Sequence, residues 1–127
     1  MIIPISIDIE DEIRKALNPF ITTYCRPLPE NFEKPCILVT KVGGTETDTI
    51  DNFRVSLDSR ADTEAEADET LRKAVGILQE VAALQSTALR VVNVNSSGSW
   101  GADPVRPDLA MCTATLEVIA HKNHMEV

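Results

Sequence analysis

The sequence is poor in the residues that most often carry chemistry or cross-link a chain. Its 127 residues include 3 cysteines, 2 histidines and 1 tryptophan, and aromatic residues make up only 4%. Cys25, Cys36 and Cys112 are widely spaced, odd in number and form no CxxC pair, so free thiols in a reducing compartment are expected rather than a disulfide scaffold. No apolar run approaches the roughly 18 residues of a membrane span, so no membrane association is expected.

Basic residues are also scarce. Lysine and arginine number 12 against 20 acidic residues, which gives a net charge of −8. A nucleic-acid-binding surface needs clustered cations, so sequence-specific DNA binding is not expected as the main function. The apolar start, Met1–Ile5, is too short for a signal peptide and lacks its basic region, which favours a protein that is cytoplasmic when made.

Recognisable catalytic motifs are missing. There is no GxSxG, HExxH or glycine-rich phosphate loop. His121 and His124 are three residues apart, but no third or fourth ligand is near them in the sequence. Cys25 has no neighbouring base, and the carboxylates of residues 62–69 belong to a helix start. We therefore expect no catalytic residue, no metal and no cofactor.

The clearest element that is present is a long amphipathic helix over Thr63–Leu84. Its apolar residues recur every three or four positions, as on one side of an α-helix. Thr63 and Glu66 have the spacing of a capping box, and acidic residues crowd the first turns, where the helix dipole favours them. At about 1.5 Å per residue this helix is about 30 Å long, enough to cross a small domain.

Shorter patterns on both sides of this helix complete the prediction of one domain over residues 1–127. A second helix is expected from Ser6 or Asp8 to Asn18. We predict an α+β, two-layer sandwich: a mainly antiparallel sheet of four to five strands with two helices packed on one face, in the order α-β-β-β-α-β-β. Residues 1–5 are expected as an extended arm or edge strand, residues 122–127 as a polar tail, and strands over Phe20–Arg26, Cys36–Val42, Phe53–Asp58, Leu89–Asn95 and Leu109–His121.

Two connections stand out as candidate contact surfaces. One is the acidic hairpin connection after Gly43-Gly44, where the glycines indicate a turn or bulge rather than a phosphate cradle. The other is the Ser/Gly/Pro-rich segment Ser96–Asp108, expected as a long loop, whose Trp100 would either anchor an interface or fold back over its own sheet. The candidate oligomer and partner interface is Gly43, Gly44, Thr45, Glu46, Asp48, Asp51, Trp100 and Arg106.

In order and patterning, several segments together resemble one family. They are DIEDEIRKALNPF, the strand CILVTKVGG, the strand and helix FRVSLDSRADTEAEADETLRKAVGILQ, and the last strand DLAMCTATLEVIAH. From about Ile7 to His121 they look like the small tail-terminator and tail-completion proteins of long-tailed bacteriophages and prophages, a group of minor tail proteins involved in head-tail joining.

The resemblance implies a structural virion protein without catalytic residues. Such a protein self-assembles into a ring, typically a hexamer, that caps the tail tube, ends its polymerisation and forms the head-tail joining surface. Its partners would be copies of itself, the tail-tube protein and head-tail connector proteins, first in the host cytoplasm and then in the virion tail or neck. DNA would pass through the ring without sequence-specific binding, and the acidic composition suits such a channel.

Two rival hypotheses remain open. A neighbouring neck component, such as a head-closure or joining protein, would have much the same pattern. A small α+β ligand-binding or enzyme domain, of a different class, would need a concave apolar site with a few converging polar groups, placed under the proline-rich loops.

Overall fold

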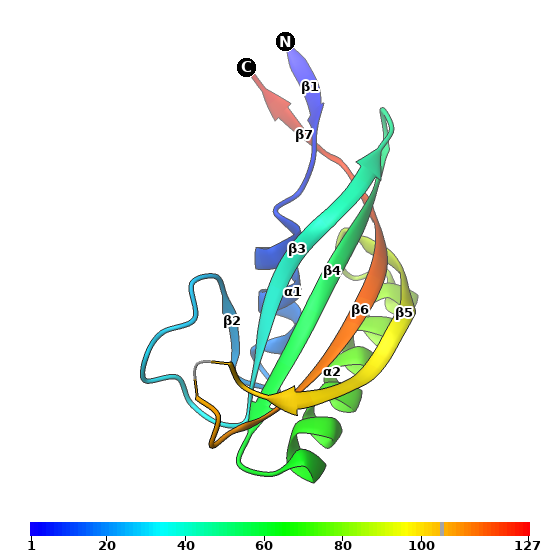
Figure 1. The fold of residues 1–127 in the computed structure, drawn as a ribbon. Helices are drawn as coiled ribbons and strands as arrows, with labels where there is room; N and C mark the ends of the chain where they lie inside the picture. The colour runs from blue at the N-terminus through cyan, green and yellow to red at the C-terminus, as the bar shows by residue number, and fades with distance from the viewer. Residues whose placement is uncertain (105) are drawn as a thin grey trace.

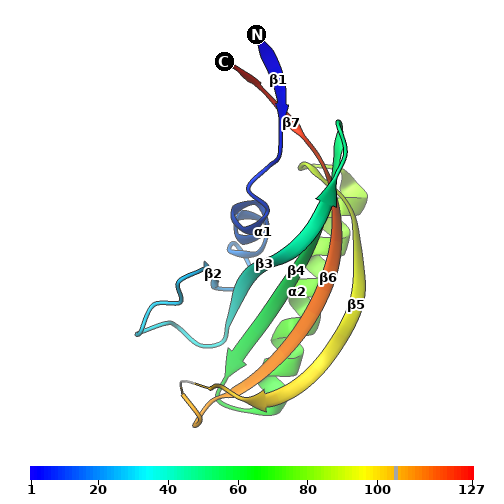
Figure 2. The same cartoon turned by 45° about the horizontal axis from the view of Figure 1, so that its top comes forward.

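The predicted α+β architecture is confirmed in the computed structural model, which describes residues 1–104 and 106–127 and, of residues 97–99, the backbone alone. A twisted sheet forms one layer, and two helices lie on one of its faces (Figures 1 and 2). In chain order the elements are β1 (Ile2–Ile5), α1 (Ile9–Leu17), β2 (Thr23–Cys25), β3 (Cys36–Glu46), β4 (Ile50–Ala61), α2 (Glu64–Leu84), β5 (Leu89–Ala102), β6 (Ala110–His121) and β7 (Asn123–Glu126).

Both helices begin within the predicted ranges, and a capping side chain precedes each of them. The side chain of Thr63 accepts a hydrogen bond from the backbone N–H of Glu66 at 3.2 Å and caps α2. Asp8 caps α1 in the same way by accepting from the N–H of Asp11. The helix α2 ends at Gln85, whose left-handed backbone closes the last turn.

The main sheet has five strands among the described residues, in the order β2-β3-β4-β6-β5. The neighbours β3–β4, β4–β6 and β6–β5 pair antiparallel, as expected, whereas the three-residue β2 pairs parallel to β3. Side chains alternate along the central strands, so Val55 and Leu57 face the helices. The core between the two layers contains Leu57, Leu78, Leu116 and Val118, all fully buried.

The opposite face of the sheet carries no helix and is polar. Its side chains bond to one another across neighbouring strands: Asn52 donates to Glu117 at 2.7 Å, and Thr113 donates to Asp58 at 2.8 Å. These cross-strand pairs satisfy the polar groups of the uncovered face.

Three segments differ from the prediction. The loop expected over Ser96–Asp108 is wrong in its first half, because β5 continues to Ala102. The cause is non-local, because residues 99–102 pair with the backbone of the long strand β6. This pairing outweighs the low strand propensity of their Ser/Gly-rich composition. The hairpin connection is likewise short, since only Thr47–Thr49 lie between β3 and β4.

The third difference concerns the polar tail expected over residues 122–127. Asn123–Glu126 form the strand β7, which pairs antiparallel with β1, so that Ile3 lies opposite Met125. The pair makes a separate two-stranded ribbon that extends beyond the sheet at the end where the β3–β4 hairpin also projects (Figure 1). Residues 2–5 are therefore an extended strand, in agreement with the expectation for the arm.

Candidate functional site

The structure places the predicted contact residues at opposite ends of the molecule. The β3–β4 hairpin, with residues 43–51, projects at the end that holds β1 and β7. Trp100 and Arg106 lie at the other end, where α2 begins (Figure 1). The two predicted surfaces are thus not brought together, because each lies at a different end of the long antiparallel strands.

The two glycines of the hairpin form a bulge, one of the two alternatives that their sequence indicated. The pairing of β3 with β4 shifts by one residue between Lys41 and Gly43, and both glycines have positive φ, +154° and +145°. Gly44 also approaches the neighbouring strand closely, since a Cβ atom there would lie 2.3 Å from the carbonyl oxygen of Asn52. The bulge therefore needs glycine for its backbone and, at Gly44, for space.

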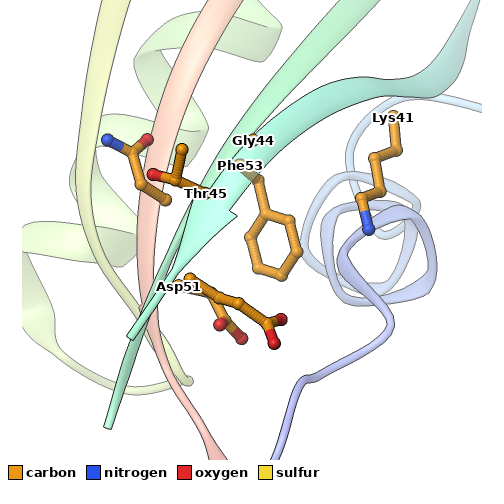
Figure 3. Close-up of a pocket in the computed structure, with 7 residues that line it drawn as sticks. Lys41, Gly44, Thr45, Asp51 and Phe53 are labelled. Carbon is orange, nitrogen blue, oxygen red and sulfur yellow. The ribbon is translucent and has the colours of Figure 1, made fainter. Parts of the chain in front are cut away.

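A cavity of about 230 Å³ lies beside this bulge (Figure 3). The Lys41 ammonium lies 5.2 Å from the centre of the Phe53 ring, within the range of a cation–π contact. The carboxylate of Asp51 lies beyond the ring on its other side (Figure 3). The full lining is Lys41, Gly44, Thr45, Glu46, Asp51, Asn52 and Phe53.

Asp51 is not part of an exposed hairpin tip, and this expectation is wrong. Its exposed fraction is 1%, because β4 begins at Ile50 and Asp51 falls in the same inward register as Phe53. Lys122, just beyond β6, places its ammonium 3.7 Å from a carboxylate oxygen of Asp51 and 3.7 Å from one of Glu46. The ion pairs of Lys122 with Asp51 and Glu46 join the base of the hairpin to the segment that follows β6. Asp51 therefore has a structural role. Of the predicted hairpin residues, Thr45, Glu46 and Asp48 are exposed.

Trp100 belongs to the edge strand β5 and not to a loop, although it is 48% exposed as an interface residue would be. Its backbone pairs with Cys112 of β6. A shallow cavity of about 390 Å³ lies beside it and includes Asp62 and Glu64 from the start of α2 and Pro107 from the loop that follows β5. Trp100 therefore keeps about half of its surface exposed at this end of the sheet.

Arg106 lines a third cavity, of about 410 Å³, which lies under the proline-rich segment between β2 and β3. The floor of this cavity is Arg60, from the end of β4, which is 8% exposed. Its Nε–H donates to Asp103 at 2.7 Å, while Nη1 is buried and has no hydrogen-bond partner among residues 1–104 and 106–127. Leu28, Pro29 and Phe32 form apolar walls, and the Arg106 guanidinium lies 5.9 Å from the centre of the Phe32 ring.

The sequence did not identify Arg60 as a site residue. The predicted strand ended at Asp58, two residues before this arginine. The alternation of Phe53, Val55 and Leu57 could have been extended to place Arg60 on the helix-free face. Its burial there depends on Asp103, which is 43 residues away in the chain and has no local signal.

The thiols are poor nucleophiles. Burial raises the pKa of Cys36 to about 11, and the nearby Arg60 guanidinium only partly opposes this shift. Burial also raises the pKa values of Cys25 and Cys112, so all three thiols are protonated near neutral pH. Among residues 1–104 and 106–127, no group of three His, Cys, Asp or Glu side chains is arranged to hold a metal ion.

Within the described chain, neither helix is long and apolar enough to cross a membrane. In comparisons with known proteins, no protein-family model matches this chain, and no curated protein matches it either. The fold and the site geometry define the class, an α+β protein with a helix-free polar sheet face and two separate end surfaces.

Proposed function

We propose that this chain is a structural subunit that assembles into a ring capping a phage or prophage tail tube, where it ends tube polymerisation and provides the head-tail joining surface. The observation that supports this best is the opposite placement of two different exposed end surfaces, the hairpin tip around Asp48 and the strand end around Trp100. A closed ring requires a head-to-tail contact between unlike surfaces of neighbouring copies, and a subunit with two such surfaces can make it.

The patterning of the chain from about Ile7 to His121 adds the family resemblance. The acidic net charge of −8 suits a ring through which DNA passes without being held. In this proposal the chain functions only by binding other protein subunits, first in the host cytoplasm during assembly and then in the virion tail or neck. The partners are copies of itself, the tail-tube protein and the connector proteins.

Light scattering after size exclusion, over a wide concentration range and at two salt levels, tests the proposal. A ring of six copies has six times the mass of the 13.9 kDa chain. A mass near that value, with a central hole in electron micrographs, would support it. A chain that stays monomeric and also fails to cap purified tail tubes would refute it.

Two aromatic substitutions sharpen this test. Trp100→Ala is expected to weaken assembly while the circular dichroism spectrum stays that of the folded chain, because about half of the Trp100 surface is exposed. Phe20→Ala is the matched control, since Phe20 is 72% exposed but lies between α1 and β2, at the opposite edge of the sheet from β5. Equal assembly of both variants would remove Trp100 from the interface.

A neighbouring neck component is the nearest alternative. Particles made without the protein separate the two: overlong tails mark a terminator, whereas tails of normal length that cannot join heads mark a joining protein. A ligand-binding domain is a further candidate function, favoured by one specific observation. The cavity with Arg60 at its floor and Phe32 in its wall has the apolar lining and converging polar groups that such a domain needs.

A further inference from the structure

The cavity between the proline-rich segment and the end of β4, here called the Arg60 cavity, combines a charged floor with apolar walls. Its volume of about 410 Å³ is within the usual range of small-molecule sites. Three of its residues, Leu28, Pro29 and Phe32, come from the segment between β2 and β3. Pro29 is exposed and Leu28 and Phe32 are half-buried, so the walls reach the protein surface.

Arg60 offers hydrogen-bond donors that none of the described residues accepts. A guanidinium has five N–H donors, and in Arg60 the Nε–H donates to Asp103 at 2.7 Å. Nη1 is buried and finds no acceptor in the described part of the chain. An arginine that is nine-tenths buried and still has free donors is a ready recognition group for a planar anion such as a carboxylate.

The other charged side chains around the cavity do not prevent the binding of an anion. Asp103 is already engaged, since it accepts from Arg60 Nε–H and from the backbone N–H of Arg106 at 3.4 Å. Arg106 pairs with Asp108 at 3.3 Å on the exposed rim, where its guanidinium can exchange partners at small cost. Glu30 is the opposing rim charge, and it is exposed to solvent.

We propose that the Arg60 cavity binds a carboxylate joined to an apolar group. The carboxylate would accept from Arg60 and Arg106, and the apolar group would pack on Leu28, Pro29 and Phe32. This assignment does not rest on ring assembly, because the cavity lies within one chain and its test uses the folded monomer or ring equally well.

The direct test is an NMR titration of the full chain with N-acetyl-leucine and, separately, with its neutral amide. Saturable shifts of the Arg60 Nε–H signal and of the amides of residues 28–32 are expected with the acid, at millimolar concentrations for so small a ligand. The amide should bind at least about tenfold more weakly, since it lacks the charge-assisted hydrogen bonds. Equal affinity for both compounds, or no saturable shift with the acid, would overturn the proposal.

Two variants locate the binding. Arg106→Gln removes the rim cation and should weaken the acid several-fold while leaving the amide unchanged. Arg72→Gln is its matched control, because Arg72 is also an exposed arginine paired with an aspartate, Asp68, but lies on α2. Arg60→Lys keeps the buried charge and removes the planar pair of N–H donors, so it should reduce the preference for the acid several-fold. Wild-type preference in both Arg106→Gln and Arg60→Lys would refute the assignment.

A third compound distinguishes the two possible sources of the carboxylate, an acidic side chain of a partner protein and a small organic acid or chain end. A blocked peptide, acetyl-Leu-Glu-Leu-amide, carries a side-chain carboxylate and no free chain end. Binding as tight as that of N-acetyl-leucine would assign the cavity to an acidic side chain of a partner protein. Binding of the free acid alone would assign it to a small organic acid or a chain end, and either result sustains the carboxylate chemistry.

Discussion

Replacing either glycine of the β3 bulge by alanine should destabilise the protein, and by different amounts. At Gly43 the only cost is the positive φ of +154°, because nothing lies within 4 Å of the added Cβ. Such a backbone conformation costs an ordinary residue about 1–3 kcal/mol. At Gly44 the φ of +145° costs about the same. The added Cβ would also lie 2.3 Å from the Asn52 carbonyl oxygen and 3.0 Å from Phe53 Cα.

Both of those atoms belong to the backbone of a paired strand, so they can move only by distorting the ladder. Overpacking of this kind adds about 1–3 kcal/mol. We therefore expect Gly44→Ala to lose about 2–6 kcal/mol of unfolding free energy and Gly43→Ala about 1–3 kcal/mol. Urea unfolding followed by far-UV circular dichroism measures both, and an unchanged m-value shows that the difference lies in stability.

Gly76→Ala supplies a control of opposite sign. Gly76 lies inside α2 with nothing within 4 Å of an added Cβ, so alanine there should stabilise by about 0.5–1 kcal/mol. A Gly44→Ala protein that is no less stable than Gly43→Ala would refute the close approach between the two strands.

The remaining predictions concern the core, a salt bridge at the surface and a thiol. Leu57→Ala should cost about 2–5 kcal/mol in urea unfolding, whereas Leu84→Ala, at a site 67% exposed, should change the free energy by less than about 0.5 kcal/mol. Burial tends to raise the pKa of Glu10, but hydrogen bonds from Arg26 at 2.6 Å and from the N–H of Lys41 outweigh it, so the pKa is lowered below its ordinary 4.5. The folded-state pKa is depressed, so the stabilisation is complete above pH 4.5 and is lost as the pH falls through the lowered pKa. The stability difference between wild type and Glu10→Gln should therefore shrink in that window, and a difference constant with pH would contradict it. Cys36, with its pKa near 11 and full burial, should react with a thiol reagent at pH 8 only after denaturation; rapid reaction of native Cys25→Ser/Cys112→Ser protein would count against that burial.

Local signals in the sequence predicted most of the elements. Thr63 and Asp8 mark helix starts through bonds to residues three positions away, and the alternation of Phe53, Val55 and Leu57 describes a strand with one buried face. Such patterns depend on neighbours in the chain, so the sequence contains them directly.

The features that were missed depend on residues far away in the chain. The extension of β5 needs the backbone of β6, and the pairing of β1 with β7 joins segments about 120 residues apart. The burial of Asp51 follows from where β4 begins, and that of Arg60 from Asp103. The candidate site was therefore predicted in part: Arg106 was named, whereas the residue at the floor of its cavity was not.

The ladder between β4 and β6 has a mechanical consequence. It pairs residues 50–61 with residues 110–121 without a single register shift, unlike the ladders on either side of it. At about 3.4 Å per residue, twelve pairs span about 40 Å. The uninterrupted pairing of β4 with β6 thus fixes the distance between the hairpin tip and the Trp100 end. Substitutions at the two ends should change the unfolding free energy of the single chain additively, because about 40 Å of paired strand separates them.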